Sequence, residues 1–237
     1  MNMVFHKSES RGRADHNWLI SRHTFSFADY YNPQCMNFGL LRVLNDDIVQ
    51  PSMGFGSHPH ENMEIISIPL AGSLRHQDCM NNKHVIREGE VQVMSAGSGL
   101  THSEYNDSDS EELKFLQIWI FPREKNIPPR YEQKHFDRET RQNKFQTLVA
   151  PDASDETIWI NQDAWLSMAD INVGNQITYP KHLSGNGVYF FVIKGTVEVD
   201  GYLMERRDGM GLVKGEGYKV SAVSEARVLA IEVPMKA

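Results

Sequence analysis

The stretch GFGSHPHENMEI places two imidazole side chains close together in the sequence. His58 and His60 are two positions apart, and the carboxylate Glu64 follows four positions after the second histidine. On a β-strand, residues i and i+2 point to the same face, so two imidazoles at this spacing would be aimed at one point. In a loop around Pro59 the same spacing would carry no meaning. The chemistry therefore depends on whether this segment is a strand.

A second pair of this kind occurs in the stretch GSGLTHSEYN, where His102 and Glu104 are again two positions apart. Two same-face pairs on neighbouring strands can converge on one cation, with three imidazole nitrogens and one carboxylate oxygen at roughly 2.0–2.2 Å. Four such ligands leave about two positions of an octahedron open, which suits catalysis better than a closed structural site. A donor set without thiolate suits Fe(II), which we expect first, and also Cu, Ni, Co, Mn or Zn.

Other titratable side chains leave two alternatives open. Glu64 can replace Glu104 as the carboxylate ligand, or it can orient an imidazole through a hydrogen bond. The remaining histidines lack the paired arrangement, and we expect most of them to be surface or hydrogen-bonded structural residues: His6, His16, His23, His76, His84, His135 and His182. Among these, only His23 and His76 are candidates for orienting a ligand.

The composition argues against several other classes of protein. The 237 residues carry a formal net charge of -7 without any block rich in lysine and arginine, so we expect no direct binding of nucleic acid. Cys35 and Cys79 are too few for a disulfide framework and do not have the spacing of metal ligands. No apolar run approaches the roughly 20 residues of a membrane span, and the N-terminal sequence lacks the apolar core of a signal peptide. We expect a cytoplasmic protein that does not enter a membrane.

Most of the chain is typical of short strands. Alternating or β-branched runs that end at Gly, Asn or Asp recur along it, as in MEIISIPLAGSLRHQD and GVYFFVIKGTVEVDG. This pattern predicts an all-β protein of the sandwich or barrel type. The charged segment PPRYEQKHFDRETRQNK (128–144) begins with two prolines, and we expect it to form a short helical linker between two halves.

The two halves share a similar rhythm, which indicates an internal duplication. DGMGLVKGEGYKVSA (208–222) follows the pattern of EGEVQVMSAGSGLTHSE but contains no histidine, and His182 of the second half lies outside the matching positions. We therefore expect an N-terminal domain over 1–127 that carries the metal site, a linker over 128–145, and a C-terminal domain over 146–237 without metal ligands.

Three stretches carry a resemblance to a known family. GFGSHPHENMEI, EGEVQVMSAGSGLTHSEYN and RHTFSFADYYNP resemble the pirin family of the cupin superfamily, in particular its bacterial quercetinase-like branch. The resemblance covers essentially the whole chain, and it implies a bicupin, two jelly-roll β-barrels packed face to face with metal only in the N-terminal barrel. Carried over position by position, it implies the ligands His58, His60, His102 and Glu104. It also implies that Glu64 is not a ligand.

The resemblance further implies an enzymatic activity. It indicates a quercetin 2,3-dioxygenase, an oxidoreductase that opens the central ring of a flavonol with O2 and releases CO. The partners would then be a small planar aromatic substrate and O2. A ligand carboxylate with one free oxygen can accept the proton of the substrate's 3-hydroxyl, so we expect Glu104 to be the catalytic base. Four apolar residues near the paired motifs are expected to contact the substrate: Met53, Phe55, Met94 and Trp119.

Two other interpretations of the same motifs are open. The resemblance also allows a metal- or redox-sensing regulatory protein that binds a protein partner. A third interpretation is a cupin that uses Zn or Ni as a Lewis acid in another reaction. All three require neutral imidazoles, so metal binding is expected to weaken as the pH falls through about 6.

Overall fold

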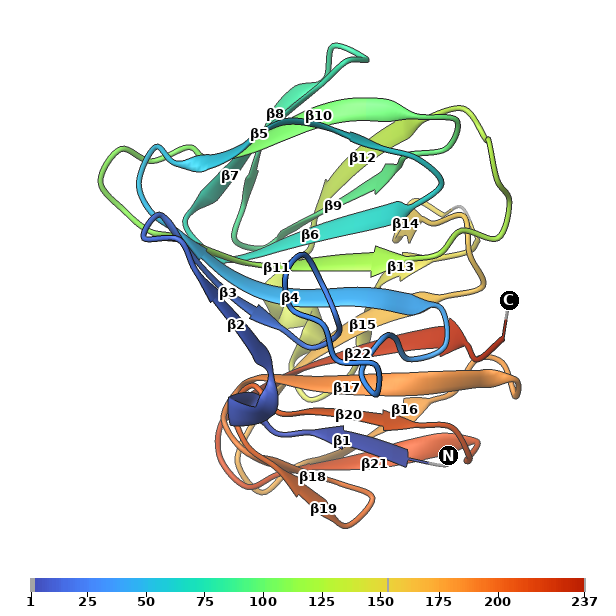
Figure 1. The fold of residues 1–237 in the computed structure, drawn as a ribbon. Coiled ribbons are helices and arrows are strands. Elements are labelled where there is room, and N and C mark those ends of the chain that lie inside the picture. Colours follow the sequence, from blue (N-terminus) through green and yellow to red (C-terminus); the bar gives the residue numbers. More distant parts are fainter. Residues whose placement is uncertain (1–2, 153, 237) are drawn as a thin grey trace.

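The computed structural model describes residues 3–152 and 154–236, and these residues form two β-barrels. In Figure 1 the N-terminal barrel, coloured mainly light blue to yellow-green, lies above the C-terminal barrel, coloured mainly orange to red. Each barrel consists of a seven-stranded sheet and a four-stranded sheet. The predicted all-β architecture with two barrels is confirmed. Among the described residues, no helix has the length and hydropathy needed to cross a membrane.

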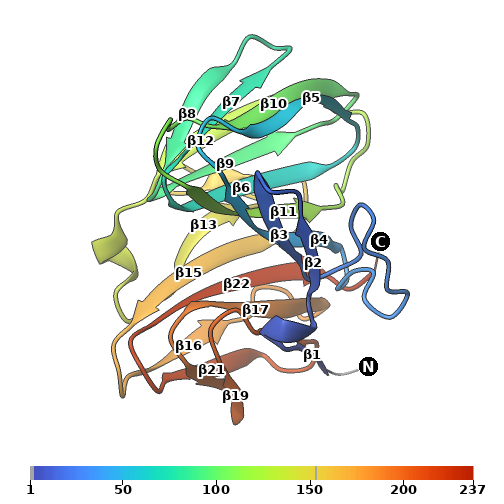
Figure 2. The same cartoon turned by 60° about the vertical axis from the view of Figure 1, so that its left-hand side comes forward.

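The N-terminal barrel presents its larger sheet to the other barrel. That sheet has the order β12 (Arg130–His135), β9 (Glu90–Ser95), β6 (Glu64–Ala71), β11 (Leu113–Ile120), β4 (Leu41–Val49), β3 (Leu19–His23) and β2 (Gly12–Asp15). The smaller sheet forms the outer layer at the top of Figure 2, and its order is β5 (Gly54–His60), β10 (Leu100–Asn106), β7 (Ser73–Asp78) and β8 (Lys83–Arg87). All strand pairs in this barrel are antiparallel.

The C-terminal barrel repeats this plan. Its larger sheet has the order β1 (Met3–His6), β20 (Gly209–Leu212), β17 (Asn186–Lys194), β22 (Ala226–Pro234), β15 (Trp165–Ile171), β13 (Gln146–Ala150) and β14 (Ile158–Trp159). Its smaller sheet has the order β16 (Gln176–Pro180), β21 (Gly217–Ala222), β18 (Val197–Val199) and β19 (Tyr202–Met204). The first strand of the chain, β1, is therefore part of the second barrel, and Figure 1 shows it in dark blue among orange and red strands.

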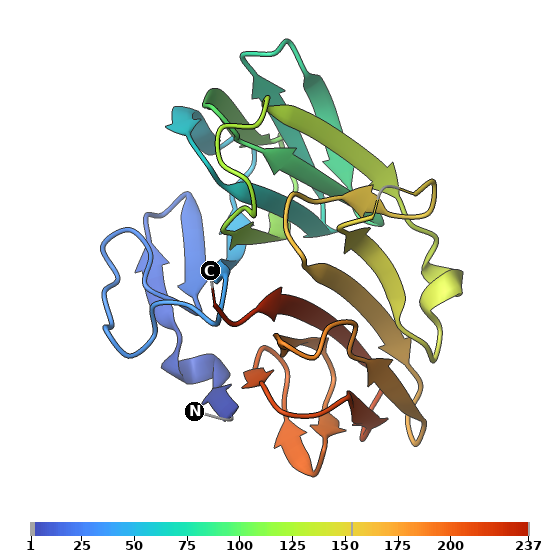
Figure 3. The ribbon, with the colours of Figure 1, turned by 90° about the vertical axis from the view of Figure 1, so that its right-hand side faces the viewer.

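The segment 128–144 is not the helix that its charge and its prolines predict. Its first part is the strand β12, which pairs with β9 at the edge of the N-terminal barrel. Only η2 (Arg138–Arg141) is helical, as one 3-10 turn capped by the side chain of Asp137, and it resembles the short η1 (Ser8–Ser10) near the other end of the chain. Figure 3 shows this yellow-green segment passing along one side of the molecule from the upper to the lower barrel.

The interiors of the two barrels differ. The apolar cluster of the C-terminal barrel is continuous, whereas the interior of the N-terminal barrel is divided into two smaller apolar clusters. In the C-terminal barrel, β16 and β21 occupy the places in the outer sheet that β5 and β10 occupy in the N-terminal one. Their buried side chains Tyr179, Tyr218 and Val220 join the apolar cluster. Hydrocarbon and aromatic rings thus fill the barrel that lacks the paired histidine motifs.

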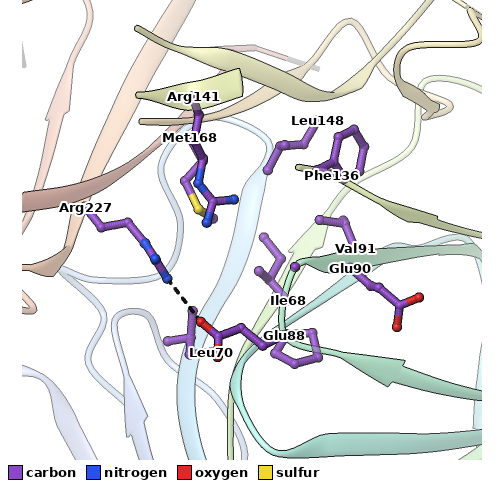
Figure 4. A pocket seen from close by; sticks show the side chains of 12 residues that line it. Ile68, Leu70, Glu88, Glu90, Val91, Phe136, Arg141, Leu148, Met168 and Arg227 are labelled. Atoms are coloured by element: carbon purple, nitrogen blue, oxygen red, sulfur yellow. Dashed lines mark ion pairs between the residues drawn. The ribbon is translucent and has the colours of Figure 1, made fainter. Parts of the chain in front are cut away.

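The largest apolar cluster of the described residues lies between the barrels and contains residues of both seven-stranded sheets. Beside it, the carboxylate of Asp170 on β15 accepts hydrogen bonds from Arg138 (3.1 Å), Arg141 (2.8 Å) and Arg227 (2.8 Å). Figure 4 shows Arg141 and Arg227 pointing into the same small cavity, where Arg227 also pairs with Glu88 of the N-terminal barrel. An ion network with one acidic centre therefore lies at the junction of the two barrels.

Replacement of Asp170 by alanine is expected to lower the free energy of unfolding by about 3–5 kcal/mol at pH 7, because two arginines would be left buried without their carboxylate. Burial alone would raise the pKa of Asp170, but the hydrogen bonds from Arg141 and Arg227 outweigh burial and lower it. Because this pKa is lowered on folding, the carboxylate stabilises the protein fully above its unfolded pKa. The stabilisation is lost as the pH falls through the folded pKa, so the difference from wild type should shrink at acidic pH.

Urea unfolding of both proteins at neutral and acidic pH measures this difference. A matched control is Asp163→Ala, because Asp163 pairs with Arg123 and both side chains are over 40% exposed. That pair should contribute at most about 1 kcal/mol. Equal losses in the two variants would contradict a central role for Asp170.

Candidate metal centre

Two adjacent antiparallel strands bring three histidines together. His58 and His60 lie on β5, His102 lies on β10, and His102 is the direct cross-strand partner of His58. The segment GSHPH is thus a strand, and its i, i+2 pair shares one face. The ring centroids are 4.4 Å apart for His58 and His102, and 4.9 Å apart for each of the other two pairs.

The three imidazoles have the arrangement that a metal site requires. One nitrogen of each lies within 4.8 Å of one nitrogen of the other two. The Nδ1 of His58 is 2.7 Å from the carbonyl oxygen of Gly56, and only a protonated Nδ1 can donate there, which leaves the Nε2 lone pair free. Both nitrogens of His102 are buried without a hydrogen-bond partner. A buried polar atom without a partner costs about 1–3 kcal/mol, which a bound cation would offset.

The local environment keeps two of these imidazoles neutral. Burial, followed by the nearby His58, lowers the pKa of His60 to about 4. Burial together with the neighbouring imidazoles lowers the pKa of His102 to about 2. Since the neutral imidazole is the form that binds metal, these groups are ready to coordinate a cation throughout the physiological pH range.

Glu104 lies next to this group on β10, beyond a β-bulge that separates it from His102. Its carboxylate accepts hydrogen bonds from Ser67 on β6 (3.1 Å) and from the amide of Gln117 on β11 (2.7 Å). The indole of Trp119 donates to the oxygen of the same amide (3.1 Å) and so fixes its orientation. Burial raises the pKa of Glu104 to about 7.

Glu104 belongs to a second group of possible ligands, with His76 and His102. His76 lies on β7 directly opposite Glu104. One of its nitrogens is 3.1 Å from the carboxylate of Asp78, and the other is buried without a partner. The spacing of His76 and Asp78 in RHQD is the same i, i+2 signal that identified the other pairs. The two groups share His102, which lies at the centre of the polar region.

Glu64 is engaged elsewhere. Its carboxylate accepts hydrogen bonds from Ser95 (2.8 Å) and from the backbone N–H of Asn161 in the second half of the chain (3.2 Å). It belongs to neither group of possible ligands among the described residues. These contacts favour Glu104 over Glu64 as the acidic member of the site.

A cavity of about 370 Å³ opens beside the imidazoles and is lined by His58, His60 and Glu104. This volume lies in the range of small-molecule sites. Aromatic rings line much of the remaining wall: Trp18, Phe27, Phe55 and Trp119. Phe27 packs edge-to-face on Trp119 with ring centroids 5.3 Å apart, and Trp18 packs in the same manner on Phe55 at 5.3 Å. The cavity therefore offers flat apolar surfaces next to a polar end.

A polar strip from β3 and β4 crosses this cavity. Ser21 donates a hydrogen bond to Asp47, and the Nδ1 of His23 lies 2.9 Å from the amide oxygen of Asn45. Burial raises the pKa of Asp47 to about 7. The four residues face inward from adjacent strands, because Ser21 is the cross-strand partner of Asp47 and His23 that of Asn45.

Comparison with known proteins places this site in a family. The profile of the Pirin family matches residues 4–120, and a profile described as the quercetinase C-terminal cupin domain matches residues 147–233. The chain is 42% identical over 232 residues to a quercetin 2,3-dioxygenase of Escherichia coli, covering 96% of this chain and 97% of that protein. The chain belongs to the pirin family. The resemblance inferred from the sequence motifs is thereby confirmed.

Two further proteins are similar to this pirin over nearly its whole length. A pirin-like protein of Caulobacter vibrioides is 40% identical over 222 residues, covering 93% of this chain and 95% of that one. Among solved structures, the bacterial pirin YhhW of Escherichia coli in complex with nickel(II) superposes with a TM-score of 0.92 at 40% identity, covering 98% and 99% of the two chains. The fold of two cupin barrels is therefore shared along the whole length.

The four predicted substrate contacts of this pirin lie in different surroundings. Phe55 and Trp119 line the cavity beside the imidazoles, whereas Met53 and Met94 do not. Met53 is 43% exposed in the turn before β5, and Met94 is fully buried in an apolar cluster with Ile65. The position of a residue near a motif in the sequence does not show on which face of the strand its side chain lies. Of the four, Phe55 and Trp119 have the position that contact with a ligand in this cavity requires.

Sequence analysis missed several residues of the pirin cavity, among them Trp18, Phe27, Asp47 and Gln117. The stretch RHTFSFADYYNP, which supported the family resemblance, contains Phe27 and also His23 of the polar strip. The alternation of buried positions along β3 and β4 was the remaining signal. It indicates which residues face inward but not which cavity they reach.

Proposed function

We propose that this pirin is a metal-dependent dioxygenase of the quercetin 2,3-dioxygenase type, which opens the flavonol ring with O2 and releases CO. The observation that carries the proposal is the convergence of three imidazoles with free nitrogens at the polar end of an aromatic cavity. The naming of a relative of 42% identity as quercetin 2,3-dioxygenase supports it.

We assign His58, His60 and His102 as ligands of one divalent transition metal, with Glu104 as the fourth. The unpartnered nitrogens of His102 and the absence of thiolate from the donor set fit such an ion. The nickel(II) complex of a pirin of 40% identity supports a divalent metal. Fe(II) is the ion that we expect first, and the donor set suits Cu, Ni, Co, Mn or Zn as well. When bound, the metal supplies a Lewis acid that holds the substrate's 3-oxygen and lowers its pKa.

Glu104 is the base in this proposal. A general base works best with a pKa near the working pH, and burial raises the pKa of Glu104 to about 7 before any metal binds. Ser67 and Gln117 hold its two oxygens in place, so the carboxyl group meets the substrate hydroxyl in a fixed orientation. Trp119, which orients Gln117, also lines the cavity and is placed to pack against a flat ring.

The test is turnover of quercetin by protein of known metal content, with and without O2. The proposal predicts loss of the flavonol spectrum and release of CO only in the presence of O2 and of bound metal. Metal analysis of protein purified without added metal identifies the native ion in the same experiment. Metal-loaded protein that leaves quercetin unchanged in air would overturn the proposed activity.

Metal retention at acidic pH provides a separate prediction. Protons compete with the metal only when the ligand imidazoles titrate, and the pKa values of His60 and His102 are lowered to about 4 and about 2. Below about pH 7, protonation of Glu104 weakens the affinity for the metal. His60 and His102 still hold the metal at pH 5, and we expect it to be lost as the pH approaches about 4. This revises the loss near pH 6 that ordinary histidines would give. Metal content after dialysis at each pH measures it, and half-loss at pH 6 would contradict the assignment.

A further inference from the structure

A second cavity, of about 450 Å³, lies on the opposite face of the strands that carry the polar strip. Along β3 and β4, Ser21 and Asp47 face the candidate metal centre, whereas the next pair, Arg22 and Asp46, faces the second cavity. The turn between β19 and β20 closes this cavity from the C-terminal barrel through Arg207. We call it the junction pocket.

The junction pocket is strongly cationic although the whole chain is acidic. Two carboxylates line it, Glu9 and Asp46. Five cationic side chains line it as well: Arg11, Arg22, Lys114, Arg206 and Arg207. In a chain of net charge -7, this concentration of positive charge in one concave site favours a negatively charged ligand.

Two of these arginines are largely buried and have too few ion-pair and hydrogen-bond partners. The side chains of Arg11 and Arg207 are 2% and 15% exposed. Both pair with the same carboxylate, Asp46, at 3.6 and 3.3 Å, so one negative charge faces two positive charges. The Nε of Arg11 and the Nη1 of Arg207 are buried without any hydrogen-bond partner.

Other contacts of these guanidinium groups do not supply the missing charge. Arg11 donates a hydrogen bond to the carbonyl of Arg22 (2.8 Å), and both guanidinium groups lie near the ring of Phe191, at 5.0 and 5.9 Å. A carbonyl and an aromatic face offset part of the cost of burial but leave a net positive charge. Guanidinium groups match oxyanions in shape and charge, so an oxyanion in the pocket would supply the negative charge that these two arginines lack.

We propose that the junction pocket binds a small oxyanion, free or as the phosphate or carboxylate group of a small molecule, and that Arg11 and Arg207 hold it. Arg11 precedes β2 of the N-terminal barrel, and Arg207 lies in the β19–β20 turn of the C-terminal barrel. The ligand therefore joins the two barrels. It also rests against the strands that carry Ser21 and Asp47 on their other face. This site is independent of the proposed dioxygenase activity.

The test is calorimetric titration of the metal-loaded protein with inorganic phosphate and, separately, with acetate, at constant ionic strength set with sodium chloride. Saturable binding of phosphate identifies a phosphate-type site, and saturable binding of acetate alone identifies a carboxylate-type site. Absence of saturable binding of both overturns the proposal.

Three variants locate the binding. Arg207→Gln should weaken the affinity at least about tenfold, because one charge-assisted hydrogen bond is lost. Asp46→Asn should strengthen it, because the competing carboxylate is neutralised. Arg87→Gln is the matched control, since Arg87 is exposed on β8 and does not line the pocket, and it should leave the affinity unchanged.

The metal content of each variant is measured alongside, so that phosphate bound at the metal is distinguished from phosphate bound at the arginines. Unchanged affinity in Arg207→Gln, or weaker affinity in Asp46→Asn, would place the anion elsewhere and refute the assignment. Arg11→Gln also alters a buried side chain, so Arg207→Gln and Asp46→Asn decide the result.

Discussion

Replacing His58 with alanine is expected to remove the bound metal and to lower quercetin turnover by at least about 100-fold. Loss of a residue that merely supports a metal ligand already costs about 10–100-fold, and loss of a ligand should cost more. His58 is suited to this test because it is only half-buried and its one hydrogen bond, from Nδ1 to the carbonyl oxygen of Gly56, leaves Nε2 for the metal. The fold should therefore survive the change.

The matched control for this variant is His135→Ala, because His135 is exposed on β12 and belongs to neither group of possible ligands. Metal content and turnover of the control should equal those of the wild type. Metal analysis and the rate of CO release are measured on the same samples. Wild-type turnover in His58→Ala protein without metal would remove the metal from the mechanism, and wild-type metal content in the variant would remove His58 from the ligands.

Replacing Glu104 with glutamine is expected to lower kcat by about 10²–10⁴-fold, the usual contribution of a positioned general base. The amide has nearly the same size, and Ser67 can still donate to its oxygen, so the change removes the proton acceptor with little change of volume. The wild-type rate should fall when Glu104 becomes protonated at low pH, whereas the residual rate of the variant should lack this dependence.

Glu64→Gln is the matched control, because Glu64 is equally buried but bonds to Ser95 and Asn161 away from the imidazoles. Metal content separates the two roles assigned to Glu104. A variant that keeps its metal but loses kcat supports the role of base, and a variant that loses both supports the role of ligand. If Glu64→Gln had the larger effect on turnover, the acidic member of the site would have been misidentified.

The candidate site could be predicted to the extent that it depends on local spacing. The period of two along a strand is enough to give His58 and His60 a common face, and the same holds for His102 and Glu104. That β5 lies beside β10 follows from the barrel and not from either motif. The position of His76 opposite Glu104 could not be predicted, because it arises across a strand pair that the sequence does not specify.

The cavity wall was harder to predict because strands far apart in the chain build it. Trp18 precedes β3, Phe55 lies on β5, and Trp119 lies on β11. Alternation of side chains along a strand indicates that such residues face inward. The interior of a barrel has both polar and apolar parts, however, and the inward side chain of Met94 lies in an apolar cluster away from the cavity.

The prediction of a helix at 128–144 was wrong for a related reason. The strand β12 lies at the edge of its sheet, where charged side chains find partners outside the barrel core. Arg130 donates to the carbonyl of Trp159 in the other half and lies over its ring, while Tyr131 stacks on His84 of the outer sheet. RYEQKH is half-buried along nearly its whole length and has no alternation of apolar and polar residues that would have predicted a strand.

The exchange of end segments between the barrels limits how the molecule can be dissected. β1 forms four residue pairs with β20 of the C-terminal barrel. Near the opposite terminus, the carbonyl of Pro234 accepts a hydrogen bond from the backbone N–H of Leu40 in the N-terminal half. Cleavage of the chain within 128–145 would leave β1 on the N-terminal fragment without its partner strand. On the C-terminal fragment, β20 would become an uncovered edge of the sheet. Each barrel therefore depends on a segment from the other end of the chain, and a deletion that removes β1 acts on the C-terminal barrel.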